Sequence, residues 1–559
     1  MNWRAPSSPA LSKPFDVAVI GGGVNGTGVA RDCAMRGMRV LLLEKNDFSS
    51  GTSSASSGMI HGGLRYLGFD RNTTRITSED SGYIQRIAPH LIFRIPWLNP
   101  VFKGEPYGME LWEIVMKAYD TFRELKGGKE HTRLTREQAL ALEPGLNPKL
   151  LGAVTWDEWG IDVPRLCFAN AMAARELGGF ILNHAEVLDF RRDGQGAVKG
   201  VRVRHGLSGE VFDIEAKITV NCAGPWVPRV ARMAGAEVRL RLGKGVHVVY
   251  DRRISNISVT ARAIDGRGVF LTPHENVSWI GTTDDDYYGD PDNLSATQDE
   301  VEYLVEGMSR VFPRIREYKR SRVMVGLRPT LYAWGKYEDD LSRRYDVIDH
   351  EERDRVAGFV TLAGGKLAAY RLMAQDTTDM VAGKLGVSAP CRTHIEPLPG
   401  ARGHADTPRI AEKARITLFT AARTAYRHGD RTEEVLSSIA DNPRWSRSVC
   451  GCEQVTEAEV RHCVQRELAG TLSDLWYRTR LGMGPCHGMA CAPRAAQILV
   501  DEQMLEPPDG HEEVARFLEF RWRDKYPVAD GLEMAQEELA RGIFIGAYGY
   551  DAFREDDGH

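Results

Sequence analysis

The strongest constraint on the fold lies near the start of the chain, where an apolar run, a glycine-rich turn and a helical pattern follow one another. The run Phe-Asp-Val-Ala-Val-Ile at residues 15–20 is typical of a buried parallel strand, and Gly-Gly-Gly-Val-Asn-Gly follows it directly. Gly21 permits a tight turn, Gly23 lets the backbone approach a pyrophosphate, and Gly26 lets a helix pack on the strand. A chance glycine loop is the alternative, but this order predicts a dinucleotide-binding unit.

The segment that follows extends this prediction. A second apolar run at residues 39–43 ends at Glu44, where a carboxylate can accept hydrogen bonds from a ribose diol. Residues 46–66 are rich in serine and glycine, whose small side chains can approach a pyrophosphate and an isoalloxazine closely. A surface linker has a similar composition, but the run His-Gly-Gly-Leu-Arg-Tyr that ends the stretch is unusually specific for a linker.

The bulk composition excludes several classes of function. The chain has 559 residues, which is enough for about three structural units. Its formal net charge of -5 creates no field that would attract nucleic acid. No apolar run approaches the roughly 20 residues that cross a bilayer, and residues 1–14 lack the apolar core of a secretory signal. We therefore expect a cytoplasmic protein that does not bind nucleic acid.

The cysteines are concentrated in the last fifth of the chain. Cys450 and Cys452 form a C-x-C pair, and after 33 intervening residues Cys486 and Cys491 form a C-x4-C pair. In a reducing compartment such a group indicates metal binding rather than disulfides, and two close pairs of thiolates can hold the two irons of a [2Fe-2S] cluster. Zinc is the rival metal, because four cysteines also suit a tetrahedral site. Cys463, within a helical pattern, is expected to be a buried thiol.

Five separated motifs resemble those of a known family. They are the glycine turn, Asn-Cys-Ala-Gly-Pro-Trp at residues 221–226, Ile-Gly-Thr-Thr-Asp-Asp at 280–285, Gly-Leu-Arg-Pro at 326–329 and Gly-Gly-Lys-Leu-Ala-Ala-Tyr-Arg at 364–371. In this order they resemble the FAD-dependent glycerol-3-phosphate dehydrogenases, within the glycine- and sarcosine-oxidase-like flavoproteins. The resemblance implies an α/β fold with a Rossmann-like FAD-binding domain, an antiparallel-sheet substrate domain and a small helical domain for a [2Fe-2S] cluster.

The C-terminal part narrows the resemblance to the A subunit of the anaerobic type. The runs at residues 426–432, 449–453 and 479–486 are similar to the C-terminal signatures of that protein, and the cysteine spacing resembles the bacterioferritin-associated-ferredoxin-like fold. The run at residues 61–65 is closer to the aerobic, single-subunit enzymes. The resemblance implies that electrons pass to a quinone or to partner subunits, and it leaves oligomerisation and peripheral attachment to the inner face of the membrane as open expectations.

The motifs and the resemblance together assign residue ranges and cofactor contacts. We divide the chain into an N-terminal extension (1–14), an FAD-dependent oxidoreductase with an interleaved substrate domain (15–385), a helical linker (386–446), a [2Fe-2S] domain (447–500) and a C-terminal helical region (501–559). The residues expected to contact FAD are Gly21, Gly23, Val24, Asn25, Gly26, Glu44, Lys45, Thr52, Ser53, Val187, Ala223, Gly224, Gly364, Gly365, Lys366 and Leu367. The expected cluster ligands are Cys450, Cys452, Cys486 and Cys491.

The substrate that the resemblance implies, sn-glycerol 3-phosphate, is a secondary alcohol with a dianionic tail. Its oxidation needs a cation, a proton acceptor and a hydride acceptor. Arg328 can bind phosphate oxygens bidentately, and Lys366 can bind the phosphate or stabilise the reduced flavin. His61 is the expected proton acceptor, since its ordinary pKa lies near neutral pH. Further active-site candidates, each of which could instead pack beside the cofactor, are Arg65, Tyr66 and Arg371.

Two other readings of the same residues stay open. In one, the substrate is a 2-hydroxy acid or a cyclic amino acid such as hydroxyproline, and Arg328 holds a carboxylate. In the other, the chain is a non-catalytic electron-transfer subunit. At the level of structure, residues 198–204 and 246–250 are expected to lie in the substrate sheet, and residues 505–559 are expected to form amphipathic helices.

Overall fold

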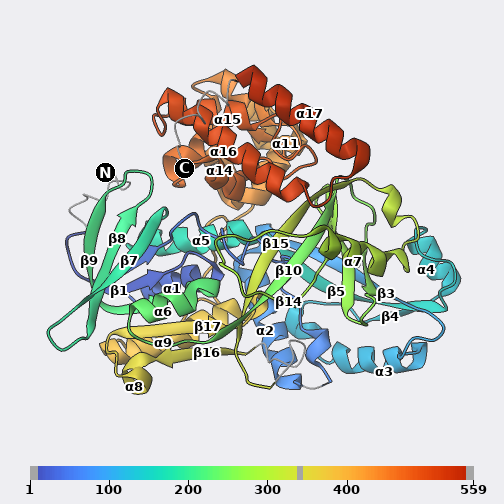
Figure 1. Cartoon of the computed structure of the whole chain (residues 1–559), viewed down its shortest axis with the longest axis horizontal. Helices are drawn as coiled ribbons and strands as arrows, with labels where there is room; N and C mark the ends of the chain where they lie inside the picture. Colours follow the sequence, from blue (N-terminus) through green and yellow to red (C-terminus); the bar gives the residue numbers. More distant parts are fainter. Residues whose placement is uncertain (1–10, 69, 336–343, 549–559) are drawn as a thin grey trace.

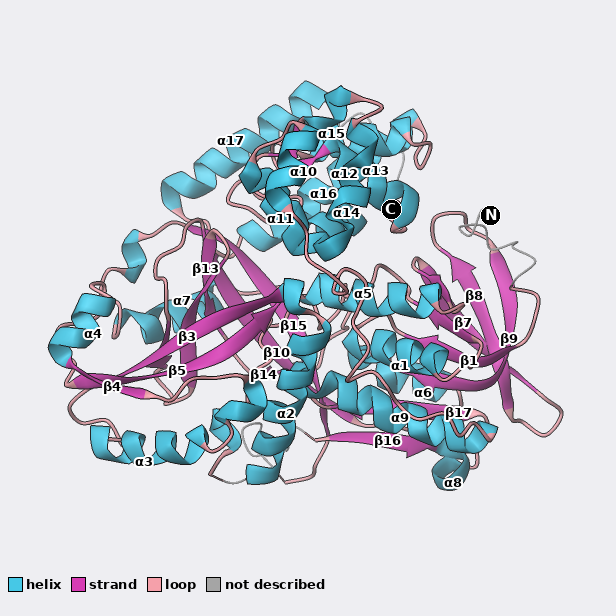
Figure 2. Cartoon of the chain, turned by 180° about the vertical axis from the view of Figure 1, so that it is seen from behind, coloured by secondary structure: helices cyan, strands magenta, loops and turns pink. Residues whose placement is uncertain are grey.

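The computed structural model describes residues 11–68, 70–335 and 344–548. Two sheets lie side by side, and a helical C-terminal unit covers both of them (Figures 1 and 2). Residues 1–10 of the predicted N-terminal extension and residues 549–559 of the C-terminal region lie outside the described residues. Within the described part, none of the helices combines the length and the apolar character needed to cross a bilayer.

The first sheet is built around the nucleotide unit predicted from the sequence. Strand β1 (Phe15–Ile20) pairs in parallel with β2 (Val40–Leu43) and β9 (Val211–Asn221), and the order of the main path is β16-β17-β9-β1-β2-β6. All residues of β2 are buried, as expected for a parallel strand that is covered on both faces. The other strands are β6 (Phe180–Leu182), β7 (Ala185–Arg192), β8 (Val198–His205), β16 (Tyr345–Asp349) and β17 (Phe359–Gly364).

Helices cover both faces of this sheet. One face carries α1 (Val24–Met35), α5 (Val163–Glu176) and α9 (Tyr370–Leu385), whose buried side chains share a core with β1 and β2. The other face carries α6 (Val227–Met233) and the loop at Leu11. This arrangement confirms the predicted α/β nucleotide-binding fold.

One sequence-based assignment to the second sheet is wrong. Residues 198–204 lie in β8, which pairs with β7 and with the first half of β9, whereas the second half of β9 pairs with β1. These strands therefore extend the nucleotide-binding sheet. An alternating strand pattern identifies a half-buried strand but not its sheet, because the partner is chosen by contacts distant in sequence.

The second sheet has the order β14-β10-β13-β12-β11-β3-β5-β4, with β15 on β10. Residues 246–250 lie in β10, as predicted, and all pairs are antiparallel except that of β3 with β11. The strands are β3 (Ile92–Val101), β4 (Thr132–Thr135), β5 (Gly152–Ile161), β10 (Leu240–Tyr250), β11 (Ser258–Arg262), β12 (Gly268–His274), β13 (Val277–Gly281), β14 (Asp285–Asp286) and β15 (Arg320–Leu331). The helices outside the C-terminal unit that remain are α2 (Arg71–Ile87), α3 (Met109–Asp120), α4 (Arg136–Leu142), α7 (Gln298–Ser309) and α8 (His350–Asp354).

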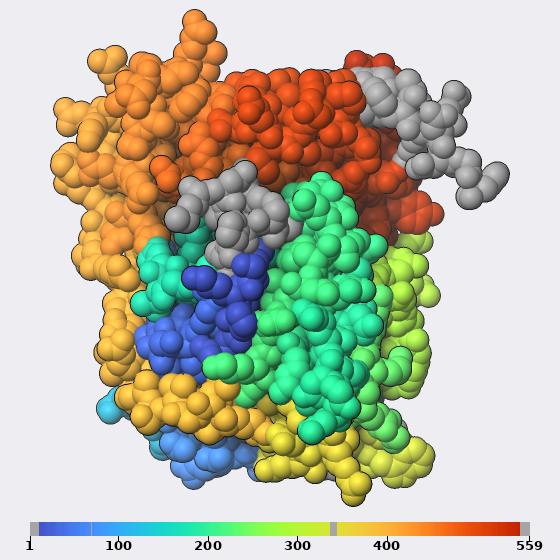
Figure 3. All heavy atoms as spheres, turned by 90° about the vertical axis from the view of Figure 1, so that its left-hand side faces the viewer, coloured from blue at the N-terminus to red at the C-terminus, as the bar shows by residue number. Residues whose placement is uncertain are grey.

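The C-terminal unit is mostly helical and rests on the first sheet's domain, as the orange and red surface in Figure 3 shows. Its helices are α10 (Thr407–Ala414), α11 (Leu418–His428), α12 (Thr432–Leu436), α13 (Glu457–Arg466), α14 (Leu472–Thr479), α15 (Ala492–Asp501), α16 (Pro507–Lys525) and α17 (Gly531–Tyr548), and its short strands are β18 (Ser448–Cys450) and β19 (Val455–Thr456). Side chains of α10, α11 and α12 share a core with Ala458 of α13. The predicted linker and the cysteine-rich segment thus pack together.

Candidate active site

The glycine turn brings the start of α1 to the carboxyl end of β1. Gly21 has a φ of 107°, which side chains rarely tolerate, and a Cβ on Gly26 would lie 1.9 Å from the Gly21 carbonyl oxygen. Ser53 Oγ accepts a hydrogen bond from Val24 N at 3.0 Å and so holds the serine-rich loop against the helix. The helix N-terminus at this edge favours an anion such as a pyrophosphate.

Glu44 follows β2 and is fixed by the backbone. Its Oε2 accepts a hydrogen bond from Gly22 N at 2.6 Å, and its Oε1 accepts one from Asn46 N at 2.9 Å. Burial raises the pKa of Glu44, and the two amide donors oppose that shift. Because each carboxylate oxygen keeps a second lone pair, the group fits the ribose diol of a dinucleotide.

A cleft runs from Glu44 past the glycine turn to the loop after β17. Its small side chains and backbone groups fit an extended dinucleotide such as FAD, and Gly26 is the one predicted contact outside its lining, because that residue packs α1 on the turn. The predicted contacts that line the cleft are Gly21, Gly23, Val24, Asn25, Glu44, Lys45, Thr52, Ser53, Val187, Ala223, Gly224, Gly364, Gly365, Lys366 and Leu367.

His61 follows the serine-rich loop and is neutral. Burial is the largest cause that lowers the pKa of His61 to about 4; Glu158 opposes this shift and Lys366 adds to it. The Nδ1 atom accepts a hydrogen bond from Gly63 N at 3.0 Å. A neutral imidazole with Nδ1 as acceptor carries its hydrogen on Nε2. In this arrangement His61 is a hydrogen-bond donor, which differs from the proton acceptor expected from its ordinary pKa.

A buried ion-pair network that the sequence analysis missed supports this turn. The Glu158 carboxylate accepts hydrogen bonds from Gly62 N at 3.0 Å and from the Tyr119 hydroxyl at 2.5 Å, and it pairs with Lys126 Nζ at 2.8 Å. Both charged side chains are almost fully buried, so each depends on the other for compensation. The one feature of the sequence that could have indicated this network is the pair of adjacent acidic residues within β5, a strand with a buried face.

Lys366, Arg65 and Tyr66 gather beside His61. Lys366 Nζ lies 4.0 Å from the centroid of the Tyr66 ring, and the Arg65 guanidinium lies 5.5 Å from the same ring. Both cations act on the imidazole, since each of them lowers the pKa of His61. The structure therefore brings four of the predicted site residues to one end of the cofactor cleft.

Arg328 belongs to a neighbouring group on β15. Its guanidinium pairs with Asp284 at 2.8 Å. Burial, and after it the Arg328 charge, lower the pKa of His247 to about 3. The His247 Nε2 atom in turn lies 2.8 Å from Ser57 Oγ. Ser57 precedes His61 by four residues, so this loop connects the two groups.

Arg371 does not line the cofactor cleft. Its Nε pairs with Asp80 of α2 at 2.5 Å, and its Nη1 donates to Thr393 Oγ1 at 3.2 Å. Both partners are buried. The predicted active-site place of Arg371 is therefore corrected: the side chain joins α9 to α2 and to the segment before α10.

Two charge pairs attach the C-terminal unit to the cofactor domain. The Arg478 guanidinium binds Asp47 at 2.7 and 2.8 Å, and His184 Nε2 lies 3.0 Å from an Asp474 oxygen. Burial works against the charged form of His184, but Asp474 outweighs it and raises the pKa of His184 to about 9. Asp47 lies three residues after Glu44, so α14 is tied directly to the cofactor loop.

The four cysteines predicted to bind metal lie in two loops that meet. Cys452 Sγ and Cys486 Sγ are 3.8 Å apart, and thiol contacts with Cys452 and Cys491 hold the pKa of Cys450 well below its usual range. A tetrahedral metal with bonds of about 2.3 Å to sulfur separates its ligands by about 3.8 Å. Cysteines from the C-x-C pair and from the C-x4-C pair thus approach each other. The spacing along the chain had instead suggested that each of these two pairs holds one iron.

Two further observations bear on this metal site. Within the described residues, no three His, Cys, Asp or Glu side chains are arranged to hold a single metal ion. A [2Fe-2S] cluster needs only two protein ligands per iron, so the donor set still fits that group. Cys463 is fully buried in α13, as predicted.

Comparison with known proteins gives the chain relatives over most of its length. Residues 16–371 match the family described as FAD dependent oxidoreductase, and residues 391–506 match the C-terminal domain of alpha-glycerophosphate oxidase. The A subunit of the anaerobic glycerol-3-phosphate dehydrogenase of Escherichia coli strain K12 is 35% identical over 555 residues, covering 98% of this chain and 99% of the relative. The aerobic glycerol-3-phosphate dehydrogenase of Staphylococcus aureus strain USA300 is 34% identical over 393 residues, 68% of this chain and 70% of the relative.

A solved structure extends the likeness to the whole fold. The glycerol-3-phosphate dehydrogenase from Bacillus halodurans, complexed with FAD, superposes with a TM-score of 0.72 at 27% identity and covers 93% of this chain and 97% of that one. Glycine oxidase from Geobacillus kaustophilus, at 22% identity and a TM-score of 0.51 over 66% of this chain and 95% of that one, shares the fold. These matches confirm the resemblance seen in the motifs: the chain belongs to the family of FAD-dependent glycerol-3-phosphate dehydrogenases.

Proposed function

We propose that this protein oxidises sn-glycerol 3-phosphate to dihydroxyacetone phosphate with FAD and passes the electrons through a [2Fe-2S] cluster. The observation that carries the proposal is the gathering of Lys366, Arg65 and a neutral His61 at one end of the cofactor cleft. The dianionic phosphate of the substrate needs these cations. The carbon that carries the hydroxyl must also be held in one orientation in order to lose its hydrogen. A carboxylate substrate would need less positive charge.

The side chains divide the work of binding and orientation. FAD, when bound, supplies the acceptor for the hydrogen that leaves C2. Lys366 and Arg65 bind the phosphate, and Arg328 adds a guanidinium from the sheet while its other donors stay with Asp284. His61 keeps its hydrogen on Nε2 and donates a hydrogen bond to the C2 oxygen, while the proton of the C2 hydroxyl leaves to water. Glu158, which binds Gly62, keeps the imidazole turn in place.

The expected phosphate role of Lys366 is tested by anaerobic titration of the flavin. Glycerol 3-phosphate should bleach the flavin absorbance of the wild type. Lys366→Met should weaken glycerol 3-phosphate binding roughly 10- to 100-fold, as expected for loss of a charged hydrogen bond. Lys149→Met, at an exposed lysine far from the cleft in sequence, is the control. Faster bleaching by lactate or hydroxyproline than by glycerol 3-phosphate would refute the substrate assignment.

Two variants separate a donor role of His61 from a proton-acceptor role. His61→Gln keeps a side-chain N–H donor, so flavin bleaching should stay within about tenfold of wild type, whereas His61→Ala should lose more. A general base would instead make both variants slower by roughly 10²- to 10⁴-fold. Because the pKa of His61 is about 4, the wild-type bleaching rate should show no His61 titration between pH 5 and 8.

The cluster part of the proposal rests on the cysteine loops. Cys450, Cys452, Cys486 and Cys491 would hold the irons, and the acceptor beyond them would be a quinone or a partner protein. We infer the corresponding division into an oxidoreductase unit (15–385), a helical linker (386–446), the cluster domain (447–500) and a C-terminal region (501–559). We infer that the protein is cytoplasmic and attaches peripherally to the inner face of the membrane, a location that a quinone acceptor would require.

A further inference from the structure

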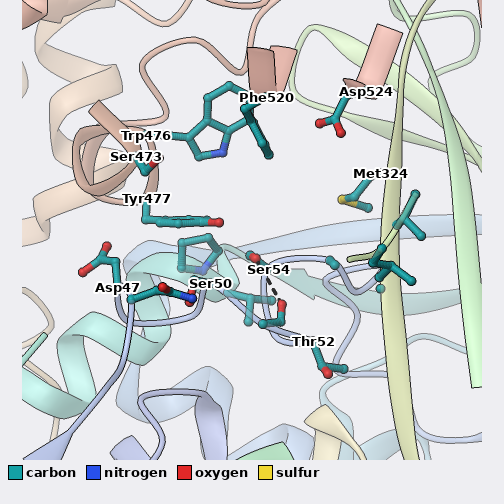
Figure 4. Close-up of a pocket in the computed structure, with 18 of the residues that line it drawn as sticks. Asp47, Ser50, Thr52, Ser54, Met324, Ser473, Trp476, Tyr477, Phe520 and Asp524 are labelled. Atoms are coloured by element: carbon teal, nitrogen blue, oxygen red, sulfur yellow. Dashed lines mark hydrogen bonds between the residues drawn. The ribbon is translucent and has the colours of Figure 1, made fainter. Parts of the chain in front are cut away.

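The serine-rich loop lies beside open space along its first half and is tightly enclosed at its end. Residues 46–58 contribute to the wall of a cavity of about 650 Å³, in which Tyr477 of α14 lies opposite Ser54 (Figure 4). Gly62 is instead buried, and a Cβ on it would overlap the Tyr119 hydroxyl. The turn that carries the imidazole is therefore packed against fixed groups.

The carboxylate that holds this turn is compensated by a single buried lysine. Lys126 Nζ lies 2.8 Å from Glu158 Oε1, and both side chains are almost fully buried. The same ammonium donates to the Tyr119 hydroxyl at 3.1 Å and to the Asp157 carbonyl oxygen at 2.7 Å. These contacts use the three donors of the ammonium, so Lys126 acts on the site through Glu158.

Helix α2 fixes both the lysine and the turn. Lys126 ends a short 3-10 helix, Arg123–Lys126, and its carbonyl oxygen accepts a hydrogen bond from Gln85 of α2 at 2.9 Å. Two turns earlier on α2, the Thr77 hydroxyl donates to the Gly62 carbonyl oxygen at 3.0 Å. The ion pair and the imidazole turn are therefore held by one helix.

The charged groups that face His61 come from four elements. They are Glu158 of β5, Lys126 of the 3-10 helix, Arg65 beside the turn and Lys366 after β17. After burial, which is the largest cause of the low pKa of His61, Glu158 acts most strongly and raises that pKa, whereas the three cations lower it. A carboxylate beside an imidazole favours the protonated ring, so the charge of Glu158 has to be compensated if the ring is to stay neutral.

We propose that Lys126 is a positioning residue that keeps His61 neutral, because its ammonium compensates the Glu158 carboxylate that holds the imidazole turn. The inference rests on the proposed function, in which the neutral ring donates from Nε2. Its Nδ1 atom accepts the hydrogen bond from Gly63 N at 3.0 Å. A proton on Nδ1 would remove that contact and release the ring from its orientation.

Two variants of the FAD-loaded, full-length protein remove the charge of Lys126. Lys126→Met removes both the charge and the donors, whereas Lys126→Gln removes the charge but keeps an N–H donor. In both, the pKa of His61 should rise from about 4 to roughly 5 to 7. The measurement is NMR of ¹³C-labelled histidine, in which the His61 signal is identified by its absence from His61→Gln. If Lys126→Met does not fold, Lys126→Gln carries the test.

Two further proteins serve as controls. Lys126→Met/Glu158→Gln removes both charges and keeps an amide oxygen as acceptor for Gly62 N, so the ring should again stay neutral. Lys117→Met removes an exposed lysine that pairs with Glu113 at 3.3 Å, and it should behave as the wild type. The rate of flavin bleaching by glycerol 3-phosphate should fall about tenfold from pH 8 to pH 5 in the two single Lys126 variants only.

Three outcomes would overturn the inference. The first is a His61 ring that stays neutral from pH 5 to 8 in a folded single variant of Lys126. The second is the same titration in Lys117→Met or in the double variant, and the third is a ring that titrates while the bleaching rate stays level. If glycerol 3-phosphate fails to bleach the wild-type flavin while the NMR titrations follow the expectation, the proposed function fails and the effect of Lys126 on His61 stands.

Discussion

The cofactor cleft and the cysteine loops both contain glycine-rich turns, but different contacts hold these turns in place. In the cleft, Gly21 and Gly26 touch through backbone, and Glu44 is fixed by two amide donors. In the loops, thiols such as Cys452 and Cys486 face each other at 3.8 Å. The cleft is therefore preorganised by the chain itself, whereas the loops bring together thiols that a metal would join in the proposed cluster.

The largest effect should come from removing one thiol. Cys452→Ser should leave the protein without iron while its FAD content stays at the wild-type level, because the two sites share no ligand. Metal analysis together with flavin absorbance measures both quantities in one sample. Cys463→Ala, at the buried cysteine outside the proposed ligand set, is the control and should keep its iron. Retention of iron by Cys452→Ser, or zinc in place of iron in the wild type, would contradict the cluster.

The cleft should be most sensitive to a change in its backbone contact. Gly26→Val places a side chain where a Cβ already meets the Gly21 carbonyl oxygen at 1.9 Å, so unfolding free energy should fall by about 3 kcal/mol or more. FAD should be lost as well. Gly383→Ala is the control, because that helical glycine has nothing within 4 Å of its Cβ position. Urea midpoints and flavin content measure the result; a wild-type midpoint in Gly26→Val would show that the turn can shift.

A smaller effect is expected when only the charge of the ribose acid is removed. Glu44→Gln keeps the shape but weakens the bonds to Gly22 N and Asn46 N, so FAD affinity should fall roughly 10- to 100-fold. Equilibrium titration of the apoprotein with FAD, followed by flavin fluorescence, gives the dissociation constant. Iron content should not change. An unaltered FAD affinity would mean that the carboxylate does not contact the ribose.

The smallest effect concerns the joint between the two regions. The pKa of His184 is about 9 in the folded protein, above its ordinary value, so its pair with Asp474 stabilises fully below about pH 6.5. That contribution, on the order of 2 kcal/mol, is lost as pH rises through 9. The urea midpoint of the wild type should therefore fall more between pH 6.5 and 9.5 than that of His184→Gln. Parallel pH curves for the two proteins would exclude this role.

The glycine turn of the cofactor cleft could be predicted from the sequence alone, because its determinants are local. A buried strand, a turn that only glycine fits and a helix lie within about twenty residues, so their contacts follow from neighbouring backbone. Fifteen of the sixteen predicted FAD contacts line the cleft. Arg371 was misassigned because a motif gives the position of an arginine in the chain but not the direction of its side chain, which the buried Asp80 decided.

By itself the sequence determined the glycine turn, the acid that follows β2, the helical C-terminal unit and the positions of the two cysteine pairs along the chain. Only the tertiary structure decided that β8 joins the first sheet, that Glu158 and Lys126 support the turn at His61, and that Asp47 meets Arg478 across 431 residues. The reason is physical: a local motif is stabilised by contacts present in its own segment, whereas buried ion pairs and sheet partners are selected by packing among segments that are distant along the chain.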